Sequence, residues 1–164
     1  MTPTIPAHRM QLADVAPRQY GAMSRLSSSV ELDHALRLLV EIRASQVNGC
    51  AFCLDMHWKD ARAAGEAEER LYMLSAWRES PLYSERERAA LNLCEAMTQI
   101  AGGGVPDDVW KQATAAFGTE ELAQVVFAIS VINTWNRLQI TTQAEPGHYQ
   151  PGMFATPASA GNGR

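Results

Sequence analysis

The chain of 164 residues is 46% hydrophobic and 20% charged, which is typical of a single soluble globular domain that can bury a core. Its formal net charge of -4 argues against nucleic acid or an anionic membrane surface as the main partner. Its apolar runs are too short for a transmembrane helix, and the N-terminal residues lack the apolar stretch of a secretory signal. We therefore expect a cytoplasmic protein.

Helical patterns follow one another in the first half of the chain, and the alternating runs that are typical of strands are scarce. Residues 11–24 are predicted to form a helix that is broken near Pro17. A strong helix is predicted over residues 30–46, after three serines that offer capping hydroxyls. Gly49 ends this run because it tolerates positive φ, and the next helix is predicted over residues 50–64.

The second half continues in the same way with four more helices. One is predicted over residues 67–77, before a connection that contains proline. Ser84 and Glu87 then have the spacing of a capping box, which marks the start of a helix. The helices expected from there on cover residues 84–100, 106–117 and 120–140.

Proline and glycine dilute the helical pattern after residue 143. We therefore predict one domain over residues 1–143, built as an all-α bundle of six to seven helices. Residues 144–164 cannot form a packed core alone, so they are expected to be either disordered or an arm on a neighbouring subunit.

The chain has three cysteines, too few for a disulfide-stapled scaffold. In a reducing compartment, a close pair such as Cys50 and Cys53 is more often catalytic, redox-sensing or metal-binding than structural. Cys94 has helical spacing with Leu91 and Met97, which predicts a core cysteine.

Cys50, Cys53 and His57 begin directly after a glycine and open a helix. At about 100° per residue, the three side chains lie within about 60° of one another on one face. Unpaired N–H groups on the first turn stabilise an anion, so this position and the CxxC spacing both favour a reactive thiolate. His57 is placed to exchange a proton with Cys53 or with a substrate, and the two sulfurs can close a disulfide.

Two other interpretations of this motif stay open. A structural zinc site needs four ligands and the motif offers three, but a catalytic zinc site with three protein ligands is compatible with it. The two cysteines could also be inert core residues. A thioredoxin fold is disfavoured because no strand precedes the CxxC motif. We favour redox chemistry without a metal or a cofactor.

The stretch from Leu36 to Arg62, with Cys50-Ala-Phe-Cys53-Leu-Asp-Met-His57 as its specific part, resembles the core of the alkylhydroperoxidase D-like (AhpD-like) family of the carboxymuconolactone decarboxylase superfamily. Further similar segments cover residues 68–72, 76–81, 84–91, 105–107 and 132–138. The resemblance implies an AhpD-like helical bundle for residues 1–143 and assembly into homo-oligomers, either trimers or hexamers. It also implies an antioxidant thiol peroxidase of the peroxiredoxin type.

The resemblance also implies roles for individual residues. Cys53 would be the nucleophile that peroxide oxidises to a sulfenic acid. Cys50 would protonate the leaving group and then form the disulfide, while His57 would belong to the proton relay. The family usually places a relay glutamate where this chain has Leu38. Glu41 lies one turn closer to the cysteines, and it is either a substitute for that glutamate or a solvated helix charge.

The leading hypothesis is therefore an enzyme that reduces a small-molecule peroxide through a CxxC dithiol-disulfide cycle and is reset by an external dithiol. One alternative is a decarboxylase or lactone-processing enzyme on the same fold. Another is a redox-sensing oligomer without enzymatic activity. Trp135, Asn136 and Arg137 are unusual on an apolar helix, and they are expected at a subunit interface or in the wall of the active-site pocket.

Overall fold

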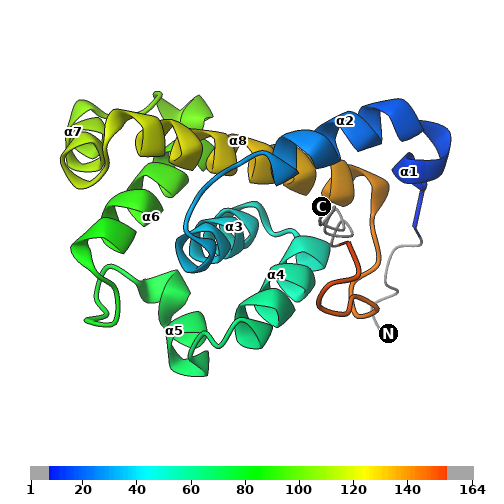
Figure 1. Cartoon of the computed structure of the whole chain (residues 1–164), viewed down its shortest axis with the longest axis horizontal. Coiled ribbons are helices and arrows are strands. Elements are labelled where there is room, and N and C mark those ends of the chain that lie inside the picture. Colours follow the sequence, from blue (N-terminus) through cyan, green and yellow to red (C-terminus); the bar gives the residue numbers. More distant parts are fainter. Residues whose placement is uncertain (1–7, 155–164) are drawn as a thin grey trace, which may run out of the picture.

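The computed structural model describes residues 8–154. Within this range the chain forms helices and no strand (Figure 1). The α-helices are α1 (Leu12–Val15), α2 (Pro17–Ser28), α3 (His34–Asn48), α4 (Ala51–Ala63), α5 (Glu68–Met73), α6 (Glu85–Thr98), α7 (Asp107–Ala116) and α8 (Thr119–Thr142), and short 3-10 helices lie at Leu74–Ala76 and Ile100–Gly102. The predicted all-α class is confirmed.

The described residues contain eight α-helices, one more than the upper bound that the sequence predicted. The extra helix arises at Pro17, where the predicted break separates α1 from α2. Proline has no N–H to continue a helix, but its fixed φ suits the first helical position, so α2 begins there.

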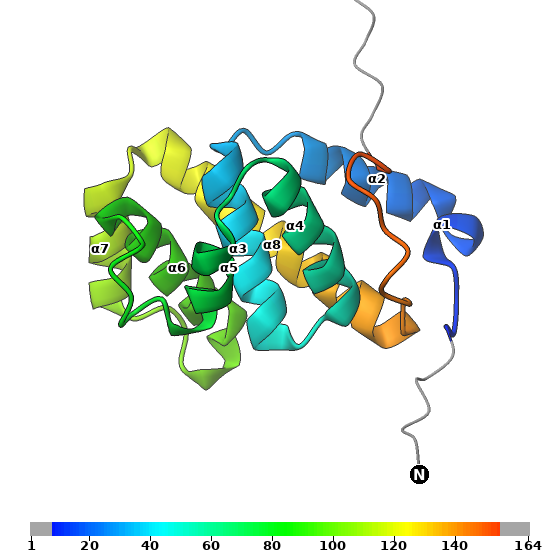
Figure 2. The ribbon, with the colours of Figure 1, turned by 90° about the horizontal axis from the view of Figure 1, so that it is seen from below.

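Helix α3 lies at the centre of the bundle and packs against α4, α6 and α8 (Figures 1 and 2). It begins at His34, later than predicted, because the Asp33 carboxylate accepts a hydrogen bond from the Leu36 N–H at 2.9 Å. It ends at Gly49, whose φ of 70° is left-handed, as predicted. The Ser84–Glu87 capping box at the start of α6 is also confirmed.

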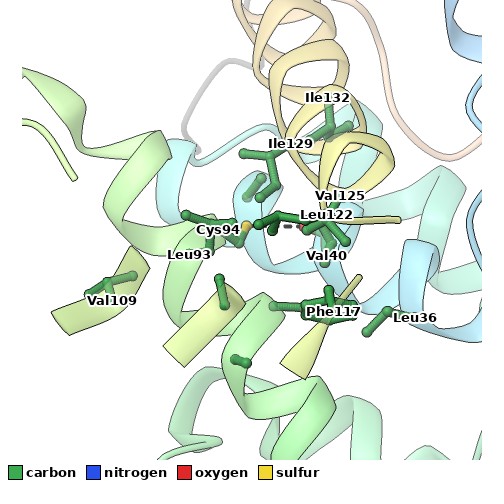
Figure 3. Packing of buried hydrophobic residues seen from close by; sticks show 14 of the residues in the cluster. Leu36, Val40, Leu93, Cys94, Val109, Phe117, Leu122, Val125, Ile129 and Ile132 are labelled. Carbon is green, nitrogen blue, oxygen red and sulfur yellow. Dashed lines mark hydrogen bonds between the residues drawn. The ribbon is translucent and has the colours of Figure 1, made fainter. Parts of the chain in front are cut away.

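The main core cluster fills the space between α3, α6, α7 and α8 (Figure 3). Cys94 lies within it, is fully buried, and approaches the Val40 carbonyl oxygen at 3.4 Å. Burial raises the pKa of Cys94 to about 12, so this thiol stays protonated. The prediction of a core cysteine is confirmed.

A second cluster joins α3 to α5 and the loop before α6, and it includes Leu38, Leu39 and Trp77. The two clusters cover different faces of α3 and fix its position relative to α4 and α8. None of the helices between residues 8 and 154 is both long and apolar enough to cross a bilayer.

Candidate functional site

The CxxC motif stands at the N-terminus of α4, as its spacing predicts. Gly49 turns the chain, Cys50 occupies the cap position with an extended backbone, and Cys53 lies on the first helical turn. Both cysteines are free and buried, with 1% of each residue exposed. Cys50 and Cys53 approach each other to 2.9 Å, close enough for one thiol to donate a hydrogen bond to the other.

This hydrogen bond makes the two sulfurs unequal. The hydrogen bond from Cys53 lowers the pKa of Cys50 against the opposing effect of burial. The same hydrogen bond, burial and the negative charge of the Cys50 thiolate raise the pKa of Cys53. The side chain of Asn136 hydrogen-bonds to the pair and lowers the pKa of both cysteines. The two thiols therefore titrate as a pair that gives up its first proton more readily than its second.

His57 lies one turn after Cys53 on α4 and is 8% exposed. Its Nδ1 is 3.2 Å from Oε2 of Glu41 on α3. The contact lacks the alignment of a hydrogen bond, and neither ring nitrogen has a hydrogen-bond partner among residues 8–154. His57 is therefore a buried imidazole that lies beside a carboxylate.

Glu41 is only 6% exposed, so it is not the solvated helix charge of the second interpretation. Its Oε1 accepts a hydrogen bond of 2.8 Å from Nε of Arg37, one turn earlier on α3. Arg37 is itself held by the Ser27 hydroxyl at 3.1 Å. One carboxylate oxygen thus faces a fixed guanidinium group and the other faces His57, which balances the buried charge.

Leu38 occupies the position where a relay glutamate was expected, and it is buried in the second core cluster. The structure thus places the nearby carboxylate at Glu41 and not at residue 38. Sequence reasoning missed Arg37 as the partner of Glu41, although the i, i+4 spacing of the two residues on one helix was a signal for this ion pair.

A buried polar network supports the dithiol from the side of α8. Asn136 donates to the Ser45 hydroxyl at 3.0 Å and accepts from Asn48 at 2.9 Å. Asn48 also donates to Asn133, which in turn donates to the Thr98 hydroxyl, both at 3.0 Å. The network joins α3, α6 and α8 at the level of the cysteines.

A cavity of about 870 Å³ opens beside the dithiol and is bounded by α2, α3, α4, α8 and residues of the C-terminal segment. Cys53, His57 and Glu41 line it, and Cys50 does not. Trp135 also lines the cavity, in agreement with the pocket-wall interpretation, whereas Asn136 lies deeper and contacts the dithiol. The volume falls in the range of sites for organic ligands.

Among residues 8–154, no group of three or more histidine, cysteine, aspartate and glutamate side chains is arranged to hold a metal ion. The features that stand together are a buried dithiol, a histidine beside a carboxylate, and a cavity that reaches one of the two sulfurs. They define an all-α protein with a buried CxxC dithiol at the edge of a cavity of ligand size.

Comparison with known proteins gives the family. A model of the carboxymuconolactone decarboxylase family matches residues 18–96. YdfG, an uncharacterized protein of Bacillus subtilis strain 168, is 39% identical over 137 residues, which make up 82% of this chain and 93% of YdfG. The chain belongs to the carboxymuconolactone decarboxylase family, and the resemblance drawn from its motifs is confirmed.

Two solved structures share the fold. ATU0492 of Agrobacterium tumefaciens, a protein of unknown function proposed to be the antioxidant defence protein AhpD, is 39% identical with a TM-score of 0.83, covering 87% of this chain and all (100%) of that one. The debrominase Bmp8 is 16% identical with a TM-score of 0.74, covering 82% of this chain and 74% of that one. The second likeness concerns the fold alone, because one fold serves different reactions.

Proposed function

We propose that this protein is a thiol-dependent peroxidase that reduces hydroperoxides through a Cys50–Cys53 dithiol-disulfide cycle. The observation that carries the proposal is the position of Cys53, which lines the cavity with Cys50 behind it and His57 one turn further along α4. Family membership supports an enzyme-related role, and the geometry of the site supports the reaction type.

The first step oxidises Cys53 and reduces the peroxide. The first thiolate forms on Cys50, so the Cys53 proton must pass to Cys50 against this order of acidities before the thiolate stands on the sulfur that lines the cavity. This thiolate attacks the terminal oxygen of ROOH, the O–O bond breaks, and the alkoxide takes the proton from Cys50. The products are the Cys53 sulfenic acid, the Cys50 thiolate and the alcohol ROH.

The second step closes the disulfide. The Cys50 thiolate attacks the Cys53 sulfur, the S–O bond breaks, and the departing hydroxide takes a proton from His57 to become water. Oε2 of Glu41 lies 3.2 Å from Nδ1 of His57 and orients the ring, while Arg37 holds the carboxylate in place. An external dithiol then reduces the disulfide, becomes a disulfide itself, and returns the protons.

The assembly and the location of the protein are also part of the proposal. Family resemblance favours a homo-oligomer, either a trimer or a hexamer, in the cytoplasm. Trp110 of α7 and Phe127 of α8 are large apolar side chains that are 46% and 51% exposed, which is compatible with contact to another subunit. A reducing cytoplasm would supply the external dithiol.

Thiol counting tests the proposal directly. The reduced wild type should show three thiols after unfolding, and one equivalent of hydrogen peroxide or cumene hydroperoxide should leave only Cys94. Cys50→Ser should stop at a sulfenic acid on Cys53, and Cys53→Ser should lose peroxide turnover. His57→Ala should form the disulfide more slowly, and Cys94→Ser should behave as the wild type with one thiol fewer.

Full peroxidase turnover in Cys53→Ser would refute the assignment of the nucleophile. Disulfide formation with background turnover and a changed oligomeric state would instead favour the redox-sensing alternative. Activity of any kind that survives alkylation of both thiols would favour the decarboxylase or lactone-processing alternative.

A further inference from the structure

Residues 144–154 leave the end of α8 and run back along α4 of the same chain, shown in orange to red in Figure 2. Two side chains of α4 hold the backbone of this segment. The Asp55 carboxylate accepts a hydrogen bond of 2.9 Å from the Gly147 N–H. Lys59 donates to the carbonyl oxygens of Gly147 and Tyr149, at 3.4 and 3.0 Å. The sequence predicted either disorder or an intersubunit arm for residues 144–164, of which 155–164 lie outside the described residues, and the attachment of 144–154 to α4 has no local sequence signal.

Tyr149 is the buried side chain of this segment, since only 6% of it is exposed. Its hydroxyl donates a hydrogen bond of 2.7 Å to the Asp60 carboxylate, and its ring stacks on Phe154 with centroids 5.6 Å apart. Burial and the neighbouring carboxylate raise the pKa of Tyr149 to about 12, so the hydroxyl remains a donor at neutral pH.

Both rings of this stack line the cavity that Cys53 lines. Tyr20 of α2 and Trp135 of α8 line it as well, in edge-to-face contact with centroids 5.1 Å apart. A cavity of about 870 Å³ is far larger than hydrogen peroxide requires. Aromatic walls bind the carbon skeleton of an organic molecule, because they offer large apolar areas at little entropic cost.

We propose that the C-terminal segment forms a substrate-binding wall of the site and that Tyr149 determines specificity by contacting the organic part of a bulky hydroperoxide. The inference rests on the proposed peroxidase function and assigns to residues 144–154 a task that the dithiol does not perform. Hydrogen peroxide has no organic part, so its reduction does not depend on this wall.

Steady-state kinetics with two peroxides test the selectivity. Tyr149→Ala should lower kcat/KM about tenfold for cumene hydroperoxide, chiefly through KM, and change it less than twofold for hydrogen peroxide. Tyr149→Phe keeps the ring and should stay within threefold of the wild type for both substrates. Met153→Ala is the matched control, because Met153 is exposed on the same segment and does not line the cavity.

A binding experiment separates this inference from the peroxidase proposal. Cumyl alcohol has the same carbon skeleton without the O–O bond, and it should slow alkylation of the CxxC thiols by iodoacetamide in the wild type. The concentration required for half protection should rise about tenfold in Tyr149→Ala and stay unchanged in Met153→Ala. This readout needs no peroxide turnover, so it holds even if the enzyme acts on another substrate.

Equal losses for both peroxides, or equal protection in Tyr149→Ala and the wild type, would overturn the role of the wall. A loss in Tyr149→Phe as large as in Tyr149→Ala would also overturn it, because the hydrogen bond to Asp60 and not the ring would then be the essential feature. Absent turnover in the wild type, with protection that depends on Tyr149, would refute the peroxidase proposal and leave the binding wall standing.

Discussion

Asn136 offers a sharp test of how the core supports the dithiol. It is fully buried on α8, donates to Ser45 and accepts from Asn48, and its side chain also hydrogen-bonds to the CxxC pair. Asn136→Ala removes all of these interactions and adds no new group. The variant should therefore change both the stability of the protein and the acidity of the dithiol.

The stability change follows from the hydrogen bonds that are lost. A typical intramolecular hydrogen bond contributes about 0.5–1.5 kcal/mol, and a buried group left without a partner costs about 1–3 kcal/mol. Asn48 keeps its contact with Asn133, whereas the Ser45 hydroxyl still donates to the Glu41 carbonyl oxygen. Ser45 and Asn48 thus each keep one hydrogen-bond partner. We expect the free energy of unfolding to fall by about 2–4 kcal/mol, which leaves a domain of ordinary stability folded.

The acidity change has a definite sign. The Asn136 side chain lowers the pKa of both cysteines, so its removal should raise the pH at which the first thiolate appears. The rate of iodoacetamide alkylation should fall at pH 7 and its midpoint should move to higher pH. Urea denaturation gives the stability, and Thr134→Ala is the control because it changes an exposed side chain on the same helix.

A folded Asn136→Ala protein with the alkylation midpoint of the wild type would refute the reasoning. It would mean that the contact between Asn136 and the dithiol does not influence ionisation. A loss of stability without a change in the midpoint would restrict Asn136 to a structural role.

Two further predictions concern the rest of the core. Burial opposes the charge of Glu95, but hydrogen bonds from Trp77, Arg78 and Arg43 outweigh it and hold the pKa of Glu95 below its ordinary value. The ionised Glu95 carboxylate therefore adds to the free energy of unfolding above the pKa of unfolded glutamate, and this contribution is lost as the pH falls through the pKa of the folded state. Glu95→Gln should lower the free energy of unfolding by about 1–2 kcal/mol in urea denaturation at pH 7 and by progressively less below about pH 4 to 5. An equal loss at both pH values would contradict this. Because its pKa is about 12, Cys94 should resist alkylation in the native protein at pH 8 and react only on unfolding, and rapid labelling of Cys94 would refute its burial.

The sequence predicted the local features of the site well, because they depend on neighbouring residues. Gly49 ends one helix, the CxxC pair opens the next, and His57 follows one turn later, all as the spacing indicates. Helix propensity and capping patterns also gave the all-α class and most helix ranges. The start of α3 was placed too early, because Asp33 and not the preceding serines provides the cap.

The long-range features of the site were not predictable to the same degree. The contact between Glu41 and His57 depends on how α3 packs against α4, and the spacing along α3 left two interpretations of Glu41. The placement of Tyr149 on Asp60 joins residues 89 positions apart, with no periodic pattern between them. Such contacts follow from the packing of whole helices and not from local propensity.

Helix α4 carries the dithiol at its beginning and the anchors of the C-terminal segment further along, so a single rigid body sets the spacing between sulfur and wall. Cys53 and Asp60 are seven residues apart, which corresponds to a rise of about 10 Å along one helix. Fluctuations in the packing of the bundle move both ends of this distance together and leave it nearly unchanged. The distance between Cys53 and the C-terminal segment therefore varies only as much as α4 itself deforms. A substitution that bends α4 should change this distance more than one that shifts the whole helix.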